Sequence, residues 1–352
     1  MENSAMKSWF VTRFASKGKS RTWLLCTLMI TALTFSLSNS CSSQNPDFEE
    51  LVAKIDKLIE ERMYAEALAP TDQAFTIALR DNGWKSISTL KVAHSLGLIL
   101  SEVGPFDRAE SFLMTTAGYD SLVFGPRSTA VALTFFNLAG VYDKQEKFRQ
   151  AIDYYERVIN IRRGSEHPTL AMSYRSLAGI YADLEQPRKG MEYANHAFRV
   201  ESKLLSEMSP DRTINLMNAA EASIQLGDFV AADTLLQYAA RIGEAYWGRN
   251  SNFFVHWNSV VGRKYFVTGH FDSAAAYFYS ARGLIKSLDV DAPLSTAKVF
   301  AGIAETELRL GNPEIALAYC DSAVVIPQSK PVSAGAIRGR IEAVRAGVGE
   351  NR

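Results

Sequence analysis

Cysteine is scarce in this chain, with three residues among 352. Cys26 lies within an apolar run and Cys41 closely follows that run, which leaves Cys320 without an intrachain disulfide partner. Histidine is also scarce, and the five histidines form neither a His-x-x-x-His pair nor a cluster with cysteine. We therefore expect no disulfide and no metal site, and the fold must be held by packing.

Neither sign of charge is in excess, because Lys plus Arg and Asp plus Glu number 38 each. Without a basic surplus, the composition does not point to nucleic acid. The charge is uneven along the chain, however, since residues 1–40 hold five basic residues and one acid. The remainder is mildly acidic and, at 47% hydrophobic residues overall, has enough apolar content to exclude global disorder.

A long uncharged apolar run extends from Leu24 to Leu37. It is shorter than the roughly 20 residues that span a bilayer and is typical of the core of a secretory signal. The small residues 38–40 and then Cys41 follow, which resembles a bacterial lipoprotein signal, although the leucine stands four residues before the cysteine instead of three. The resemblance implies lipidation of Cys41. Cleavage after Ser40, an uncleaved anchor and an organelle transit peptide are the alternatives.

A repeat with a spacing of 42 residues runs through the rest of the chain. Its marker residues are separated by steps of 42, 42, 39, 42, 42 and 42 residues, and helical periodicity on either side of each marker predicts two helices per repeat. Small residues three positions after the markers allow the helices to approach closely. The markers are Tyr64, Phe106, Phe148, Pro187, Phe229, Phe271 and Pro313, and the small column is Ala67, Ala109, Ala151, Gly190, Ala232, Ala274 and Ala316.

These positions resemble the tetratricopeptide repeat, and the long spacing is similar to that of kinesin light chains. The resemblance implies an all-α fold, namely an α-solenoid in the form of a right-handed superhelix. Seven helix-turn-helix repeats would occupy residues 48–326, and a capping helix would follow in 327–352. Residues 1–40 would be the targeting segment and 41–47 a short linker. The third repeat carries the pattern as Phe135, Leu138-Ala139, Tyr142, Phe148, Ala151, Tyr155 and Val158.

Three further expectations concern packing and chemistry. Phe148, Phe229 and Phe271 are predicted to fill the space beside the small column, and Pro187 is predicted to loosen the turn of the fourth repeat. No Gly-x-Ser-x-Gly or Gly-x-Gly-x-x-Gly motif is present, and Gly18-Lys19-Ser20 lacks the earlier glycine of a phosphate-binding loop. We therefore predict a protein that is not an enzyme and has no cofactor, with a catalytic site assembled from distant repeats as the alternative.

The resemblance also implies that the first helix of each repeat lines a concave groove that binds an extended peptide. Asn137 and Asn218 stand where members of the family use Asn to hold a peptide backbone, or else each bonds a neighbouring repeat. Groove charges change from acidic in the first two repeats to basic in the last two, which either orients a ligand or is scattered solvated charge. The predicted groove residues are Lys91, His94, Phe136, Asn137, Arg175, Asn218, Glu221, Arg263, Phe266, Lys298 and Arg309.

A cluster of five aromatic residues at the junction of the fifth and sixth repeats is a second candidate surface. It is either a docking patch or packing between the repeats. The cluster consists of Tyr246, Trp247, Phe253, Phe254 and Trp257.

We therefore predict a scaffold that binds a protein or peptide partner and does not bind nucleic acid. It would be an exported, membrane-anchored lipoprotein that faces the periplasm or the exterior of a bacterium, or alternatively a secreted soluble protein. The alternative function is a glycan- or solute-binding lipoprotein that partners an outer-membrane transporter. That alternative predicts a deep pocket lined by stacking aromatic residues, with Trp247 and Trp257 exposed to it.

Overall fold

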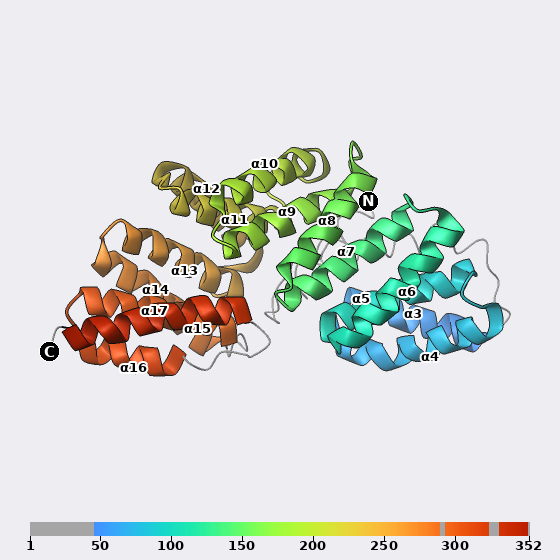
Figure 1. Cartoon of the computed structure of the whole chain (residues 1–352), viewed down its shortest axis with the longest axis horizontal. Helices are drawn as coiled ribbons and strands as arrows, with labels where there is room; N and C mark the ends of the chain where they lie inside the picture. Colours follow the sequence, from blue (N-terminus) through green and yellow to red (C-terminus); the bar gives the residue numbers. More distant parts are fainter. Residues whose placement is uncertain (1–45, 289–292, 324–330, 351–352) are drawn as a thin grey trace. The chain divides into compact units, whose positions relative to one another are not determined.

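The computed structural model describes residues 46–288, 293–323 and 331–350, and within these ranges every regular element is an α-helix (Figure 1). The predicted signal, its apolar run and Cys41 lie outside the described residues. The helices are α3 (Pro46–Glu60), α4 (Tyr64–Asn82), α5 (Ile87–Val103), α6 (Phe106–Phe124), α7 (Thr129–Lys144), α8 (Phe148–Arg162), α9 (Pro168–Asp183), α10 (Pro187–Leu204), α11 (Arg212–Gln225), α12 (Phe229–Trp247), α13 (Asn252–Val267), α14 (Phe271–Ser287), α15 (Pro293–Arg309), α16 (Pro313–Ala323) and α17 (Pro331–Glu350).

Each of the seven marker residues is the first residue of the second helix in its repeat, so the repeat is a helix pair from α3–α4 to α15–α16. The alanines of the small column, from Ala67 to Ala316, are fully buried. This confirms the predicted all-α solenoid of helix-turn-helix repeats. Its stability comes from the stacking of neighbouring pairs, because no pair buries both of its faces alone.

Close packing between helices requires glycine as well as alanine at certain positions. A Cβ added to Gly97 of α5 would lie 2.6 Å from Leu113 Cδ2 of α6. A Cβ added to Gly302 of α15 would lie 2.5 Å from the Phe278 ring of α14, which also approaches Gly262 of α13. The Phe278 ring therefore fills a space between α13, α14 and α15. That space exists because Gly262 and Gly302 have no side chains.

The turns between the two helices of a repeat share one backbone feature. The residue two positions before each marker has a positive φ, which costs least for glycine. Three turns use Arg62, Glu146 or Glu185 there instead. The φ values are 60° at Arg62, 75° at Gly104, 55° at Glu146, 54° at Glu185, 77° at Gly227, 78° at Gly269 and 84° at Gly311.

The fourth turn corrects one expectation, because Pro187 does not loosen it. The N–H of Gln186 donates to the carbonyl of Tyr181 at 2.8 Å, just as the N–H of Lys147 donates to Tyr142 at 2.9 Å in the third turn. Pro187 occupies the first position of α10, where the missing N–H is not needed by the helix.

The single 39-residue step has a local cause in α8. This helix has 15 residues, whereas α4, α6 and α12 each have 19. A deficit of three to four residues is close to one helical turn, so the buried face of α8 keeps its direction. Ala151, Tyr155 and Val158 accordingly remain buried.

The predicted aromatic filling is only partly correct. Phe148 is buried, but Phe229 and Phe271 are half-buried at the ends of their helices. The large, fully buried aromatic side chains are instead Tyr155 and Phe136, both in the third repeat, and Phe278 is 2% exposed. The aromatic markers therefore indicate where the second helices begin, but most of them are not the side chains that fill the core.

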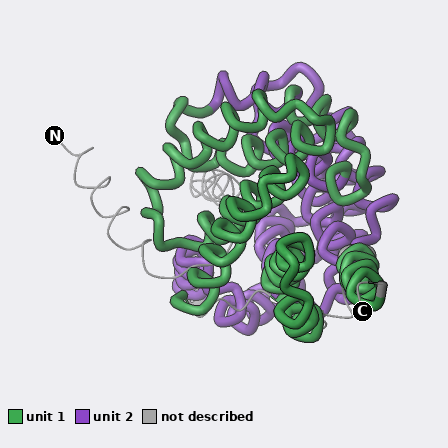
Figure 2. The backbone as a smooth tube through the Cα atoms, turned by 90° about the vertical axis from the view of Figure 1, so that its left-hand side faces the viewer, with its two compact units in different colours: residues 1–22, 181–195, 205–352 green, residues 23–180, 196–204 purple. Residues whose placement is uncertain are grey.

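The chain divides into two compact units (Figure 2). The N-terminal unit comprises the described residues up to 180 together with 196–204, and the C-terminal unit comprises 181–195 and the described residues from 205 onward. In the C-terminal unit, α17 packs on α15 and α16 through Ile337, Ile341 and Val344. Within the described ranges, no helix combines the length and the hydrophobicity that crossing a bilayer requires.

Candidate binding surfaces

The first helices of the N-terminal unit bury three of the predicted groove residues. Phe136 and Asn137 of α7 are each 1% exposed, and Arg175 of α9 is 4% exposed. The side-chain oxygen of Asn137 is buried and has no hydrogen-bond partner among the described residues. In this conformation these three side chains cannot contact a ligand, which differs from the expectation of an accessible groove.

Arg175 is instead held by a buried acid. Its Nη1 lies 3.6 Å from Oε1 of Glu201 in α10, whose side chain is 0% exposed. A buried carboxylate requires such a partner, because an isolated charge in the protein interior is strongly unfavourable. Arg175 therefore fastens α9 to the end of α10.

His94 forms an equivalent contact two repeats earlier. Its Nε2 lies 3.0 and 2.9 Å from the two carboxylate oxygens of Asp120 in α6. Thr134 of α7 donates to the same fully buried carboxylate at 2.6 Å. One acid thus joins three helices and two repeats.

The two buried pairs occupy the same position of the repeat, because each pair is separated by 26 residues. In the C-terminal unit the equivalent positions of the fifth repeat hold Met217 and Gly243, which carry no charge. One pattern in the sequence predicts the first of these pairs. Asp120 follows Ala109, Leu113 and Thr116 on the buried side of α6, so a carboxylate there needs internal partners.

Two further charged residues on first helices of the N-terminal unit, Lys144 and Asp56, also interact with neighbouring groups of the protein. Lys144 donates to Glu102 at 2.8 Å and to the carbonyl of Ser101 at 2.6 Å. Burial, reinforced by Glu60, raises the pKa of Asp56 to about 6, and the nearby Lys91 partly opposes this rise. Lys91 itself is half-buried.

In the C-terminal unit the predicted groove side chains are closer to solvent. Lys298 and Arg309 of α15 are exposed, and Asn218 and Glu221 of α11 are half-buried. Glu221 lies 3.6 Å from His256 Nε2 on the adjacent first helix. The side chains that a partner could contact are therefore concentrated on α11, α13 and α15.

The basic residues on this face are partly neutralised. Arg263 Nη1 donates to Glu305 at 3.1 Å and lies over the ring of Phe266. The capping helix adds Arg340, which binds Glu305 with two hydrogen bonds of 2.7 Å. Arg340 was not predicted from the sequence, because only packing of α17 on α15 brings it there.

Lys298 also has an acidic neighbour, since its Nζ lies 3.7 Å from Asp183 Oδ1. The predicted basic end of the groove therefore contains matched acids, which reduces the proposed gradient of charge. Arg309 is exposed and has no ion-pair partner among the described residues.

The five clustered aromatic residues mostly pack against one another. Phe254 is 2% exposed, and its ring contacts Phe253 and Trp257 edge-on at centroid distances of 5.1 and 5.6 Å. Phe253 also covers Gly243 of α12, where an added Cβ would lie 2.2 Å from the ring. Tyr246 is the member that remains 48% exposed, so the cluster does not form a broad apolar docking patch.

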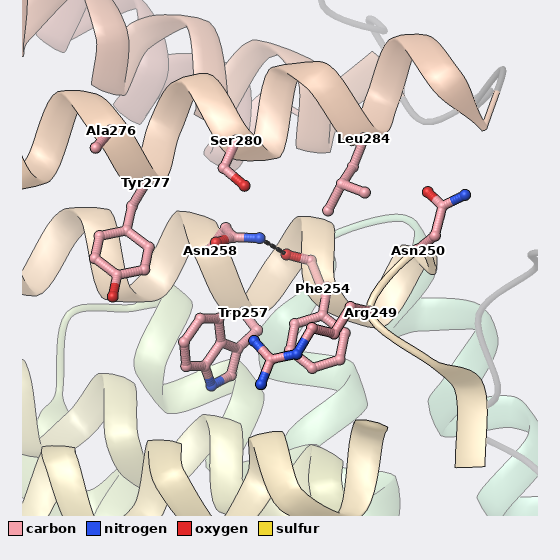
Figure 3. A pocket seen from close by; sticks show the side chains of 9 residues that line it. All are labelled: Arg249, Asn250, Phe254, Trp257, Asn258, Ala276, Tyr277, Ser280 and Leu284. Atoms are coloured by element: carbon pink, nitrogen blue, oxygen red, sulfur yellow. Dashed lines mark hydrogen bonds between the residues drawn. The ribbon is translucent and has the colours of Figure 1, made fainter. Parts of the chain in front are cut away.

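Beside this cluster lies a cavity of about 530 Å³ that is open to solvent and lined by residues of α13 and α14. Phe254, Trp257 and Asn258 of α13 line it together with Tyr277, Ser280 and Leu284 of α14 (Figure 3). Arg249 and Asn250, from the loop before α13, complete the lining, with Arg249 beside Phe254. Trp257 lines the cavity and Trp247 does not, whereas the alternative function predicted a deep pocket to which both are exposed.

Other chemistry is sparse among the described residues. They contain no group of three or more His, Cys, Asp or Glu side chains that could hold a metal ion. Cys320 is buried, and burial raises the pKa of its thiol, which disfavours the reactive thiolate.

Comparison with known proteins supports the repeat assignment. Residues 88–164, which span the second and third repeats, match the family model described as tetratricopeptide repeat. Among curated proteins, none matches this chain with significance.

Three solved structures resemble this chain, and the two with a TM-score above 0.5 show the similarity of fold. A tetratricopeptide repeat protein from Parabacteroides merdae ATCC 43184 is 13% identical over 86% of this chain and 100% of its own, with a TM-score of 0.57. A Rap protein complexed with competence and sporulation factor is 16% identical over 81% of this chain and 78% of its own, with a TM-score of 0.58. Repeats of a kinesin light chain from Podosopora anserina are 19% identical over 56% of this chain and 96% of their own, with a TM-score of 0.47. At these identities the similarity concerns the fold, and the fold is that of tetratricopeptide repeats.

Proposed function

We propose that this protein is a non-enzymatic scaffold that binds a protein or an extended peptide on the first helices of its C-terminal unit. The observation that carries the proposal is the accessibility of polar side chains on α15. Lys298 and Arg309 are exposed there, whereas Phe136, Asn137 and Arg175 on the N-terminal first helices are buried.

Two features of this face suit an extended chain. Asn218 carries an amide that both donates and accepts, and the ring of Phe266 is half-buried beside Arg263. Arg263, Lys298 and Arg309 favour a ligand with acidic groups, although Glu305 and Asp183 reduce that preference. The solved Rap protein is complexed with competence and sporulation factor, a precedent for ligand binding on a similar fold.

Site-specific photo-crosslinking in intact cells tests the binding face. A photoreactive amino acid at position 298 or 309 should give the same crosslinked partner. The matched controls are positions 282 and 286, which are exposed on the second helix α14. If crosslinks form equally well from 282 and 286, the partner does not bind the first-helix face.

We further propose that the protein is exported and anchored through a lipid on Cys41. The support is the basic segment, apolar run and small residues that precede this cysteine. Metabolic labelling with palmitate should mark the full chain and the Cys320→Ala variant but not Cys41→Ala. Label retained by Cys41→Ala would contradict the anchor without affecting the proposed binding face.

A further inference from the structure

The cavity between α13 and α14 combines aromatic surface with uncharged polar groups. Three aromatic side chains contribute to it, namely Phe254, Trp257 and Tyr277. The Trp257 ring lies 6.0 Å from that of Tyr277 at 69°, so the two rings present faces in different directions. A volume of about 530 Å³ lies within the range of small-molecule sites.

The aromatic walls are held in place from behind. The indole N–H of Trp257 donates to the carbonyl of Leu236 in α12 at 2.9 Å. The ring of Tyr277 stacks on Tyr265 at a centroid distance of 5.4 Å and an interplanar angle of 10°. These contacts fix the rings before any ligand binds, which lowers the entropic cost of binding.

The cavity offers no net charge to a ligand. Its one ionisable cation, Arg249, forms a two-pronged bond with Glu244, at 2.9 Å from Nε and 2.8 Å from Nη2. The guanidinium also lies over the ring of Phe254, 5.8 Å from its centroid. Glu244 balances the charge of Arg249, so nothing in the lining selects an anion and the cavity suits a neutral molecule.

Several uncharged polar groups remain available to such a molecule. Among the described residues, the hydroxyl groups of Tyr277 and Ser280 have no hydrogen-bond partner. Asn258 uses its Nδ2 to donate to the carbonyl of Phe254 at 2.7 Å, which leaves its Oδ1 as an acceptor. Asn250 accepts from Ser287 through Oδ1, and its Nδ2 is left as a donor.

From this combination we propose that the cavity is a carbohydrate-binding site for a neutral pyranose. A pyranose ring has apolar C–H faces that pack on aromatic rings and hydroxyl groups that both donate and accept hydrogen bonds. Both requirements are met here by Trp257 and Tyr277 and by the free groups of Ser280 and Asn258. A purely apolar side chain of a partner would leave those polar groups without partners, at a cost in free energy.

This site is distinct from the face proposed to bind a protein or peptide. Ser280 is exposed on the second helix α14, whereas Lys298 and Arg309 belong to the first helix α15. The two ligands would therefore bind independently, and failure of one proposal does not affect the other.

Isothermal titration calorimetry on the full-length chain, in a detergent without a sugar headgroup, tests the site. The probes are the methyl glycosides of glucose, galactose, mannose and N-acetylglucosamine, and N-acetylphenylalanine amide serves as an apolar probe. We expect saturable binding of at least one glycoside. Tyr277→Phe keeps the ring but loses one hydrogen bond, so it should weaken binding about threefold to tenfold.

A blocking variant separates binding in the cavity from binding elsewhere. Ser280→Trp fills the cavity from an exposed position and should abolish glycoside binding. Asp272→Trp places the same side chain at an exposed position of α14 outside the cavity and should leave binding unchanged. Circular dichroism confirms that both variants fold.

Three results would overturn the proposal. They are the absence of binding by every glycoside, glycoside binding that Ser280→Trp leaves intact, and binding of N-acetylphenylalanine amide alone. The last result would assign the cavity to an apolar side chain of a protein partner.

Discussion

The two compact units use the same helix pair but place its polar residues differently. In the N-terminal unit, His94 and Arg175 contact the buried acids Asp120 and Glu201. In the C-terminal unit the equivalent positions carry no charge, and Phe278 packs between Gly262 and Gly302 instead. The comparison teaches that this position is buried in both units, since Met217 is 2% exposed. A basic side chain there needs an acid opposite it on the second helix, as His94 and Arg175 have.

The largest effect should come from breaking a buried pair in the N-terminal unit. Arg175→Ala removes a cation that pairs with the buried Glu201 and should lower the free energy of unfolding by about 3–5 kcal/mol. Lys298→Ala removes a pair whose side chains are 47% and 45% exposed, so the loss should stay below about 1 kcal/mol. Urea unfolding combined with hydrogen exchange measures both. Similar losses in the two variants would remove the proposed difference between the units.

Packing in the C-terminal unit should be the next most sensitive feature. Gly302→Ala forces a methyl group against the Phe278 ring and should cost about 1–3 kcal/mol. Gly283→Ala on α14 meets open space and should instead stabilise by about 0.5–1 kcal/mol. Thermal unfolding compares the two variants. A stabilising Gly302→Ala would show that the three helices do not approach as described.

A matched pair of threonine substitutions tests whether a hydrogen bond to buried Asp120 contributes more to stability than a buried hydrogen bond to a helix carbonyl. Thr134→Val removes a donor from buried Asp120 and should cost about 1–2 kcal/mol. Thr306→Val removes only a bond to the carbonyl of Gly302, a helix carbonyl, and should cost less than about 0.5 kcal/mol. Equal destabilisation in chemical denaturation would argue against a special role for Asp120.

The smallest effect concerns pH in the N-terminal unit. Because Asp56 has a pKa of about 6 instead of 3.8, the folded state binds more protons than the unfolded state between pH 4 and 6. Stability from this group therefore falls as the pH rises through that window. Asp56→Asn should stabilise at pH 7 by about 1 kcal/mol, after allowance for solvent screening, and have little effect at pH 4. A gain of the same size at both pH values would exclude the titration of Asp56 as the cause.

The fold was predictable because its determinants recur. Seven markers and seven small residues repeat in register, and each marker begins a helix. The conformation of the turns was only partly predictable, since Arg62, Glu146 and Glu185 adopt the positive φ that glycine signals elsewhere. These three positions could be identified only by alignment with the glycines of the other repeats.

The candidate binding residues were less predictable, because accessibility depends on contacts between helices. Arg175 and Lys298 are both basic residues on first helices, yet one is buried and the other is exposed. Arg340 joins the face through the packing of a helix outside the repeats. The cavity similarly depends on Tyr277 and Ser280, which lie on a second helix that the groove pattern does not include.

The turn within each repeat has a consequence for how the array tolerates changes in length. The two helices of a repeat are joined by two or three residues, whereas four to seven residues separate one repeat from the next where the structure describes that connection. An insertion in the first kind of connection would disrupt the positive-φ residue and its hydrogen bonds. Among the described connections of the second kind, residues 205–211 before α11 contain no positive-φ residue, whereas the others have one each at Gly83, Gly125, Gly164 and Gly248. Epitopes, reporter domains or permuted termini are therefore best introduced at residues 205–211, and the short turns within repeats should be left intact.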